Sequence, residues 1–354
     1  MIILKVLHAL TSNKLSGAEN VVADICMMFE NEYEMVYCSP DGQIRKDLQD
    51  RGVNFIPLRK LNVFELIKVV KKFNPDIIHA HDVKATLIST VVSGKIPVIS
   101  HLHGNSKDMT RITIKSILYF LSSLKVKKII GVSESCIEEY VLNKFIKNKA
   151  IVLKNIIYEK RLNALFDKDI NNYDFDFIFL GRLSYAKNPE RVAKVASKVL
   201  KCCPNAKFGV IGEGELKDEM IKVFKSEGVI DRVTFTGKLP YPYKALKSSK
   251  CLLMCSRYEG LPIAALEAMA LGVPVVSTPV DGLKEIIING ENGFLSDLDH
   301  ELVDYVIEIL SDKNRYSYMT DACKRFFKEN NKEKLYKNAL LELYNSTLEQ
   351  KYNY

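Results

Sequence analysis

Two glutamates lie eight positions apart in the stretch of residues 256–272, which reads SRYEGLPIAALEAMALG. Pro262 is a residue type that favours the first turn of a helix, and Gly272 is a type that ends helices, so the sequence predicts a helix between them. Glu267 is the only charged residue of this helix, and a helix so apolar is normally buried. A buried carboxylate needs a hydrogen-bonding partner, which is either an arginine elsewhere in the core or a bound ligand.

The start of this predicted helix is suited to a phosphate group, because its N–H groups are free and its dipole is positive there. Glu259 lies in the loop that leads into the helix, and Glu267 lies within it. Carboxylates on both sides of a phosphate site indicate a ligand that carries phosphate and hydroxyl groups together. A nucleotide sugar is such a ligand.

Arg182 and Lys187 supply two positive charges in a loop that follows a predicted strand. Arginine binds two phosphate oxygens at once, and lysine acts as a point charge. Gly17 lies in a loop before the first predicted helix, where the absence of a side chain allows a phosphate to approach the backbone. All three residues fit a phosphate ligand. The alternative for the two cations is an ordinary place on the solvated surface.

Four of the six histidines, His79, His81, His101 and His103, lie at the ends of two predicted strands. Alternate residues of a strand share one face, as two metal ligands would, but no carboxylate cluster completes a ligand set. We therefore predict no metal site, and we expect a structural or hydrogen-bonding role for most of these histidines. His103 is the best candidate for contact with a substrate, because its strand gives way to a loop at Gly104.

Short β-rich runs alternate with helical patterns, which is typical of parallel sheets built from βαβ units. The expected strands are residues 2–7, 35–38, 54–57, 76–79, 97–101, 128–132 and 150–154 in the first half, and 176–181, 207–211, 232–236, 250–255 and 273–277 in the second. From about residue 299 onward the pattern is helical only. The sequence therefore predicts an α/β protein with two doubly wound domains.

A polar stretch without clear periodicity, residues 156–173, is the expected linker. It divides the chain into domains 1–165 and 166–331, with the last helix, 332–354, packing back on the first domain. Doubly wound domains bind ligands at the carboxyl ends of their strands. We expect the ligand site in a cleft between two facing domains.

The composition describes a protein of 354 residues that is 47% hydrophobic and 27% charged. No apolar run reaches the roughly 18 residues of a membrane span, and the N-terminus reads as a strand rather than a signal peptide. The eight cysteines form no CxxC pair, as expected of reduced thiols in a cytoplasmic protein.

The net charge of +8 lies entirely in residues 1–165, which hold 24 Lys and Arg against 16 Asp and Glu. An anionic partner is therefore expected for this half. Within it, residues 106–128 combine a broad apolar face with basic flanks, as in a helix that lies on an anionic membrane surface. The alternative is an ordinary core-facing helix with basic ends.

The motif Glu259-x7-Glu267, followed by the Asn-Gly-Phe of residues 292–294, resembles the retaining glycosyltransferases of family 4, which have the GT-B fold. The matching motifs that accompany it are Arg182 and Lys187 after Gly181, the VIGEG of residues 210–214, the Phe-Thr-Gly of residues 235–237, His103 with Gly104, and the Ser-Gly-Ala-Glu of residues 16–19. Together they extend from about residue 15 to residue 295. The resemblance is to the bacterial enzymes that make capsule, exopolysaccharide or O-antigen.

The resemblance implies how the nucleotide part of a donor is bound. Arg182 and Lys187 would hold the diphosphate, and Gly17 would approach it from the other domain. Glu267 would bind the ribose hydroxyls, while Gly237 and Leu239 would face the base.

The resemblance also implies which residues bind the donor sugar. Glu259 and the backbone of Gly260, Leu261 and Pro262 would hold this sugar, and His103 would contact it near the reacting carbon. His103, Arg182, Lys187 and Glu259 are thus the expected catalytic residues.

The implied reaction is the transfer of a hexosyl or N-acetylhexosaminyl group, with retention, from a nucleotide sugar to a lipid-linked or glycan acceptor. A UDP-sugar is the favoured donor. Fixed cations and helix N–H groups would stabilise the departing diphosphate, so neither metal nor cofactor is expected. The enzyme would act in the cytoplasm, peripherally on the cytoplasmic membrane, without nucleic acid. The open alternatives are a sugar-nucleotide epimerase of GT-B-like shape and a non-enzymatic nucleotide-binding protein.

Overall fold

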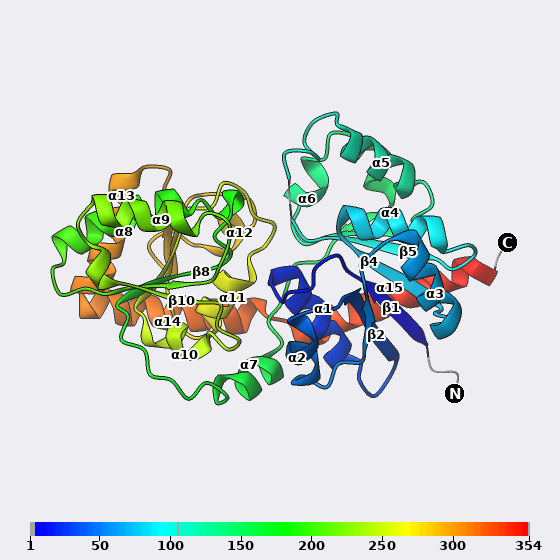
Figure 1. Cartoon of the computed structure of the whole chain (residues 1–354), viewed down its shortest axis with the longest axis horizontal. Helices are drawn as coiled ribbons and strands as arrows, with labels where there is room; N and C mark the ends of the chain where they lie inside the picture. The colour runs from blue at the N-terminus through cyan, green and yellow to red at the C-terminus, as the bar shows by residue number, and fades with distance from the viewer. Residues whose placement is uncertain (1–3, 105, 353–354) are drawn as a thin grey trace. The chain divides into compact units, whose positions relative to one another are not determined.

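The computed structural model describes residues 4–104 and 106–352, and their side chains as far as residue 349. The chain forms two compact units (Figure 1). Residues up to Tyr158 and from Glu333 onward make the first unit, and residues from Glu159 to Lys332 make the second. The division therefore falls a few residues before the expected boundary at 165, and the last helix groups with the first unit.

The described part of the first unit contains a parallel seven-stranded sheet in the order β3-β2-β1-β4-β5-β6-β7. Its strands are β1 (Lys5–Ala9), β2 (Glu34–Pro40), β3 (Phe55–Leu58), β4 (Ile77–His81), β5 (Val98–Leu102), β6 (Lys128–Gly131) and β7 (Ala150–Val152). Its α-helices are α1 (Gly17–Met28), α2 (Ile44–Gln49), α3 (Val63–Phe73), α4 (Asp82–Val92), α5 (Ile114–Ser123), α6 (Ser135–Glu138) and α15 (Glu333–Tyr352). The strand order reverses between β1 and β4, which is where doubly wound sheets bind ligands.

The described part of the second unit contains a parallel six-stranded sheet in the order β10-β9-β8-β11-β12-β13. Its strands are β8 (Phe177–Leu180), β9 (Phe208–Ile211), β10 (Val233–Gly237), β11 (Cys251–Met254), β12 (Val275–Ser277) and β13 (Gly293–Leu295). Its α-helices are α7 (Glu159–Phe166), α8 (Pro189–Cys202), α9 (Lys217–Ser226), α10 (Tyr243–Ser248), α11 (Ile263–Ala270), α12 (Leu283–Ile286), α13 (Asp299–Ser311) and α14 (Lys313–Asn330). Here the order reverses between β8 and β11.

The predicted α/β class with two doubly wound sheets is confirmed, and every expected strand is present to within a few residues. Strand β13 was not predicted, because a three-residue strand carries too little alternation to be recognised. Its Gly293 is required by packing, since a Cβ there would lie 2.2 Å from the carbonyl oxygen of Val275. Among the described residues no helix has the length and apolar character needed to cross a membrane.

Two expected elements differ in the structure. The stretch 156–173, expected as an irregular linker, contains α7, which buries Arg161, Leu162 and Leu165. Because one of the three buried residues is an arginine, the hydropathy pattern of this stretch does not indicate a helix. The helix expected over 106–128 is shorter, because Thr113 begins it with a capping box to Ser116 and it ends at Ser123.

Candidate functional site

Three loops of the second unit meet at the carboxyl ends of β8, β9 and β10. The Leu183 N–H donates to the carbonyl of Glu213 at 3.0 Å, and the Gly212 N–H donates to that of Gly237 at 2.9 Å. A Cβ at Gly212 would lie 1.9 Å from the carbonyl oxygen of Gly181. The glycines of the VIGEG motif thus allow these loops to pack backbone against backbone.

Glu259 is buried and held by several neighbours at the end of β11. The Lys187 ammonium lies 2.5 Å from Glu259 Oε1, and the Ser256 hydroxyl donates to the same oxygen at 2.6 Å. The backbone N–H of Glu259 donates to the carboxylate of Asp281. Lys187 and Glu259, both expected to contact the donor, are therefore in direct contact with each other. The contributions of Ser256 and Asp281 were not foreseen from the sequence.

Helix α11 follows this loop and matches the helix predicted from the sequence. Pro262 is the residue just before the first helical residue, with φ −72° and ψ 120°, so it caps the helix rather than standing in its first turn. Gly272 has a φ of +76°, the left-handed conformation that glycine supplies at helix ends. The helix is buried along most of its length, and Glu267 is 4% exposed.

Glu267 pairs with an arginine of the core. Arg161 Nη1 lies 3.0 Å from Glu267 Oε1, and the Tyr243 hydroxyl lies 3.4 Å from the same oxygen. Arg161 itself is fully buried and also donates to the Tyr243 hydroxyl. The arginine alternative for Glu267 is therefore present in the structure. Sequence reasoning did not identify this arginine, because it lies in the stretch expected to be a linker.

The two glutamates are thus held in the same way. In each, Oε1 receives both a cationic side chain and a hydroxyl group, Lys187 and Ser256 for Glu259, Arg161 and Tyr243 for Glu267. These partners fix the orientation of both carboxylates before any ligand binds.

The remaining expected donor-binding residues are divided between the units. Gly260, Leu261 and Pro262 are buried between Glu259 and α11, whereas Arg182 is exposed in the loop after β8. Gly237 and Leu239 are half-buried at and just after the end of β10.

Gly17 and His103 belong to the first unit. Gly17 is exposed at the first position of α1. Its neighbour Ala18 and His103 both line a pocket of about 440 Å³, together with Asp82, Lys115 and Tyr140.

His103 belongs to a cluster of five histidines on the first sheet. Strand register places His8 beside His79 and His81 beside His101, and these four side chains are buried. Sequence reasoning missed His8, although it stands one residue before the end of the first strand. Burial lowers the pKa of His8 and of His103 to about 3 and lowers those of the other three as well. All five rings are therefore neutral at pH 7.

Direct hydrogen bonds connect three of these rings. His8 Nδ1 lies 3.0 Å from His81 Nε2, and His81 Nδ1 lies 2.9 Å from His103 Nε2. His79 Nδ1 lies 2.9 Å from the hydroxyl of Tyr344 on α15. Two groups of three nitrogens lie within 4.8 Å, a spacing that also suits a metal ion. Within each group one pair of nitrogens lies at hydrogen-bond distance, His8 with His81 and His81 with His103. Nε2 of His79 and both ring nitrogens of His101 have no hydrogen-bond partner among the described residues.

Helix α5 of the first unit buries mostly serines and exposes apolar side chains, which is the reverse of an ordinary surface helix. Its buried residues are Ser116, Tyr119, Ser122 and Ser123. Its apolar side chains face outward instead, and Ile114 is 79% and Leu121 52% exposed. The exposed apolar residues on and next to this helix are Ile112, Ile114, Ile117, Leu118, Leu121 and Leu124. The alternative of an ordinary core-facing helix does not fit this pattern.

Comparison with known proteins gives matches along most of the chain. Residues 15–161 match the model of Glycosyltransferase Family 4, and residues 160–326 match that of Glycosyl transferases group 1. A protein of Escherichia coli named UDP-Gal:alpha-D-GlcNAc-diphosphoundecaprenol alpha-1,3-galactosyltransferase is 23% identical over 88% of this chain and 89% of its own. The capsular polysaccharide biosynthesis glycosyltransferase CapH of Staphylococcus aureus is 25% identical over 84% of this chain and 86% of its own.

Solved structures share the fold at low sequence identity. HepE of Anabaena, in complex with UDP-glucose, has a TM-score of 0.82 and 17% identity over 97% of this chain and all of its own. Sucrose-phosphate synthase of Thermosynechococcus elongatus has a TM-score of 0.75 and 14% identity over 97% of this chain and 98% of its own. With two Rossmann-like units and both family models matched in succession, the chain belongs to the family 4 and group 1 glycosyltransferases of the GT-B fold.

Proposed function

We propose that this glycosyltransferase transfers a hexosyl or N-acetylhexosaminyl group, with retention, from a UDP-sugar to a lipid-linked or glycan acceptor of a bacterial surface polysaccharide. The observation that carries the proposal is the pair of oriented carboxylates, Glu259 and Glu267, on either side of the start of α11. Support for UDP comes from HepE, which was solved with UDP-glucose, and from the name of the Escherichia coli relative.

Breaking the bond between the sugar and the diphosphate leaves negative charge on the nucleotide. Lys187 has three N–H donors, and its contact with Glu259 uses one, so the others are available to phosphate oxygens. Arg182, exposed in the same loop, offers a bidentate contact. The first N–H groups of α11 have no partner within the helix and add to this field. We assign stabilisation of the departing diphosphate to these three sources.

The carboxylates are assigned to hydroxyl groups of the donor. Arg161 and Tyr243 engage Oε1 of Glu267, so we assign its Oε2 to the ribose. By the same argument Oε2 of Glu259, with the backbone of Gly260, Leu261 and Pro262, binds the donor sugar. Gly237 and Leu239 face the base in this proposal.

Two further residues are assigned in the first unit. Gly17 approaches the diphosphate, and His103 contacts the donor sugar from the pocket that it lines.

A donor screen tests the proposal. The chain is incubated separately with UDP-glucose, UDP-galactose, their N-acetylhexosamine counterparts and GDP-mannose, and released nucleoside diphosphate is measured. We expect release from one or two UDP-sugars, and an α-linked product by NMR once an acceptor is supplied. Release from none of them, or conversion of one UDP-sugar into its epimer, would contradict the proposal.

Helix α5 suggests how the enzyme reaches its acceptor. Its outward apolar face is flanked by Lys115 and Lys125, with Lys127 and Lys128 following, and a basic apolar helix suits an anionic lipid surface. We propose that α5 binds the cytoplasmic membrane peripherally and so brings the enzyme to a lipid-linked acceptor. The excess positive charge of residues 1–165 has the sign that this surface attracts.

Vesicle flotation tests this part of the proposal. Binding to vesicles of phosphatidylglycerol and phosphatidylcholine should weaken with salt, and about fivefold for each of Lys125, Lys127 and Lys128 changed to Glu, since each is worth about 1 kcal/mol. Leu121→Ser should also weaken binding, while Phe64→Ser, an exposed apolar residue on α3, should not. Donor hydrolysis should survive all of these changes. Equal binding by every variant would contradict the membrane role.

A further inference from the structure

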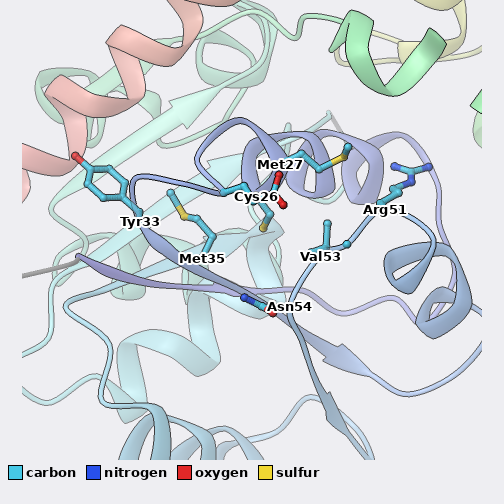
Figure 2. Close-up of a pocket in the computed structure, with 9 residues that line it drawn as sticks. Cys26, Met27, Tyr33, Met35, Arg51, Val53 and Asn54 are labelled. Atoms are coloured by element: carbon cyan, nitrogen blue, oxygen red, sulfur yellow. The ribbon is translucent and has the colours of Figure 1, made fainter. Parts of the chain in front are cut away.

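His103 stands at one end of a hydrogen-bonded series of buried groups in the first unit. The series runs from Met35 Sδ to His8 Nε2 at 3.3 Å, from His8 Nδ1 to His81 Nε2 at 3.0 Å, and from His81 Nδ1 to His103 Nε2 at 2.9 Å. Met35 is 3% exposed on β2 and borders a cavity of about 40 Å³, room for about one water molecule (Figure 2). The series therefore links the interior of the sheet to the pocket that His103 lines.

The chemistry of the first member fixes the direction of every bond. A thioether sulfur has no hydrogen and only accepts, so His8 Nε2–H must donate to Met35. A neutral imidazole carries one proton, which leaves His8 Nδ1 as an acceptor for His81 Nε2–H. By the same step, His81 Nδ1 accepts from His103 Nε2–H.

These bond directions require a single proton on each ring, and burial keeps the rings in that neutral state. The pKa of His8 and of His103 is lowered to about 3, and that of His81 is lowered well below its usual value. Each ring is therefore neutral at pH 7.

The lone pair that remains belongs to His103 Nδ1. That nitrogen is buried and has no hydrogen-bond partner among the described residues. The His103 ring stacks on that of His101, with centroids 4.2 Å apart, and its backbone N–H lies 3.3 Å from Asp82 Oδ1. The ring is thus held in place, and its one unused atom is an acceptor.

We propose that Met35, acting through His8 and His81, fixes His103 in the tautomer that accepts a hydrogen bond at Nδ1, and that this atom receives a hydroxyl group of a sugar in the 440 Å³ pocket. The identity of the ligand as a sugar rests on the proposed function, whereas the tautomer does not. Met35, His8 and His81 are positioning residues. In this tautomer His103 has no proton at Nδ1 to give, so it binds the sugar without acting as an acid.

Nitrogen NMR of the full-length chain labelled with ¹⁵N-histidine reads the tautomer directly, because a nitrogen with a lone pair and one with a proton differ widely in chemical shift. His103→Gln identifies the signals of His103. In the wild type we expect a proton on Nε2 and a lone pair on Nδ1. A proton on Nδ1 would overturn the proposal whatever the enzyme does with UDP-sugars.

Met35→Leu removes the sulfur acceptor in a volume-conserving exchange. A second population of His103, protonated at Nδ1, should appear in this variant. Met28→Leu is the matched control, since Met28 is a buried methionine of α1 with no hydrogen bond to a histidine in the described chain, and it should keep the wild-type spectrum. A wild-type spectrum for Met35→Leu would remove Met35 from the proposal.

His81 gives a second, kinetic test. Asparagine offers a carbonyl oxygen near the place of Nδ1, while leucine offers no acceptor. We expect His81→Leu to raise the KM for the UDP-sugar about tenfold with a smaller effect on kcat, and His81→Asn to recover most of this loss. Equal KM values for the two folded variants would mean that His81 only fills space.

Discussion

The two units satisfy their buried polar groups by different means. In the second unit carboxylates are paired with cations, Glu259 with Lys187 and Glu267 with Arg161. In the first unit five neutral histidines are clustered on one sheet, and direct hydrogen bonds link three of them. An ion pair supplies charge, whereas a neutral ring supplies a donor or acceptor of fixed direction. This difference agrees with our proposal that Lys187 of the second unit faces a diphosphate and that His103 of the first unit receives a hydroxyl group.

This difference predicts opposite responses to substitution. Removing one partner of a buried ion pair leaves an uncompensated charge and costs much stability. Replacing a neutral imidazole by a side chain of similar size costs less stability. Its main effect is on the direction of the hydrogen bonds that the ring made with its neighbours.

Glu267→Ala should have the largest effect, a loss of about 3–5 kcal/mol in the free energy of unfolding, because it leaves the Arg161 guanidinium buried without its carboxylate. Denaturant unfolding measures this loss. Changing Arg161 and Glu267 together to Met should cost much less, since no unpaired charge remains. Equal losses in the single and double variants would show that the pair is not the source of the effect.

Lys187→Met should lower kcat about 10²–10³-fold, or about 3–4 kcal/mol, the usual effect of removing one donor to a developing anion. The matched control is Lys194→Met, whose exposed partner Glu190 lies 2.6 Å away on the same helix. That change should leave kcat almost unaffected, since such pairs contribute little. Similar losses in both variants would contradict a specific role for Lys187.

Acid should destabilise the chain through the histidine cluster. The folded-state pKa of His8 is about 3 and the unfolded value about 6.5, so above pH 6.5 neither state binds a proton. Below pH 6.5 the unfolded state binds one and the folded state does not, so stability falls as pH falls, by up to about 1.4 kcal/mol per pH unit for this ring. Unfolding at pH 7.5 and pH 5 measures this dependence.

The control for acid destabilisation is the sixth histidine. His300→Gln changes an exposed residue and should keep the full pH dependence, while His8→Phe should reduce it. Identical dependence in the two variants would contradict a buried, neutral His8.

Chelation should have the smallest effect. Turnover should persist in excess EDTA, because the proposed charge stabilisation uses Lys187, Arg182 and helix N–H groups. Activity lost with EDTA and restored by manganese or magnesium would contradict this mechanism. Activity restored only by zinc would instead implicate the histidine nitrogens.

The sequence predicts the sheets well, because each strand is a short apolar run flanked by turn residues and helices. It also predicts α11 from Pro262 and Gly272. It did not predict the partners inside the site. Arg161 and His8 come from segments far away in the sequence, and only the strand order and helix packing bring them to Glu267 and His81. Local patterns contain no information about such pairings.

The most direct test of the account is calorimetric titration with UDP and with the UDP-sugar that the donor screen identifies. Glu267→Gln should weaken binding of both by about 1–3 kcal/mol, the cost of an unsatisfied polar partner. His103→Phe should weaken binding of the UDP-sugar and leave that of UDP unchanged. Unchanged affinities in Glu267→Gln, or an equal loss for both ligands in His103→Phe, would contradict the assignment of the ribose to Glu267 and of a sugar hydroxyl to His103.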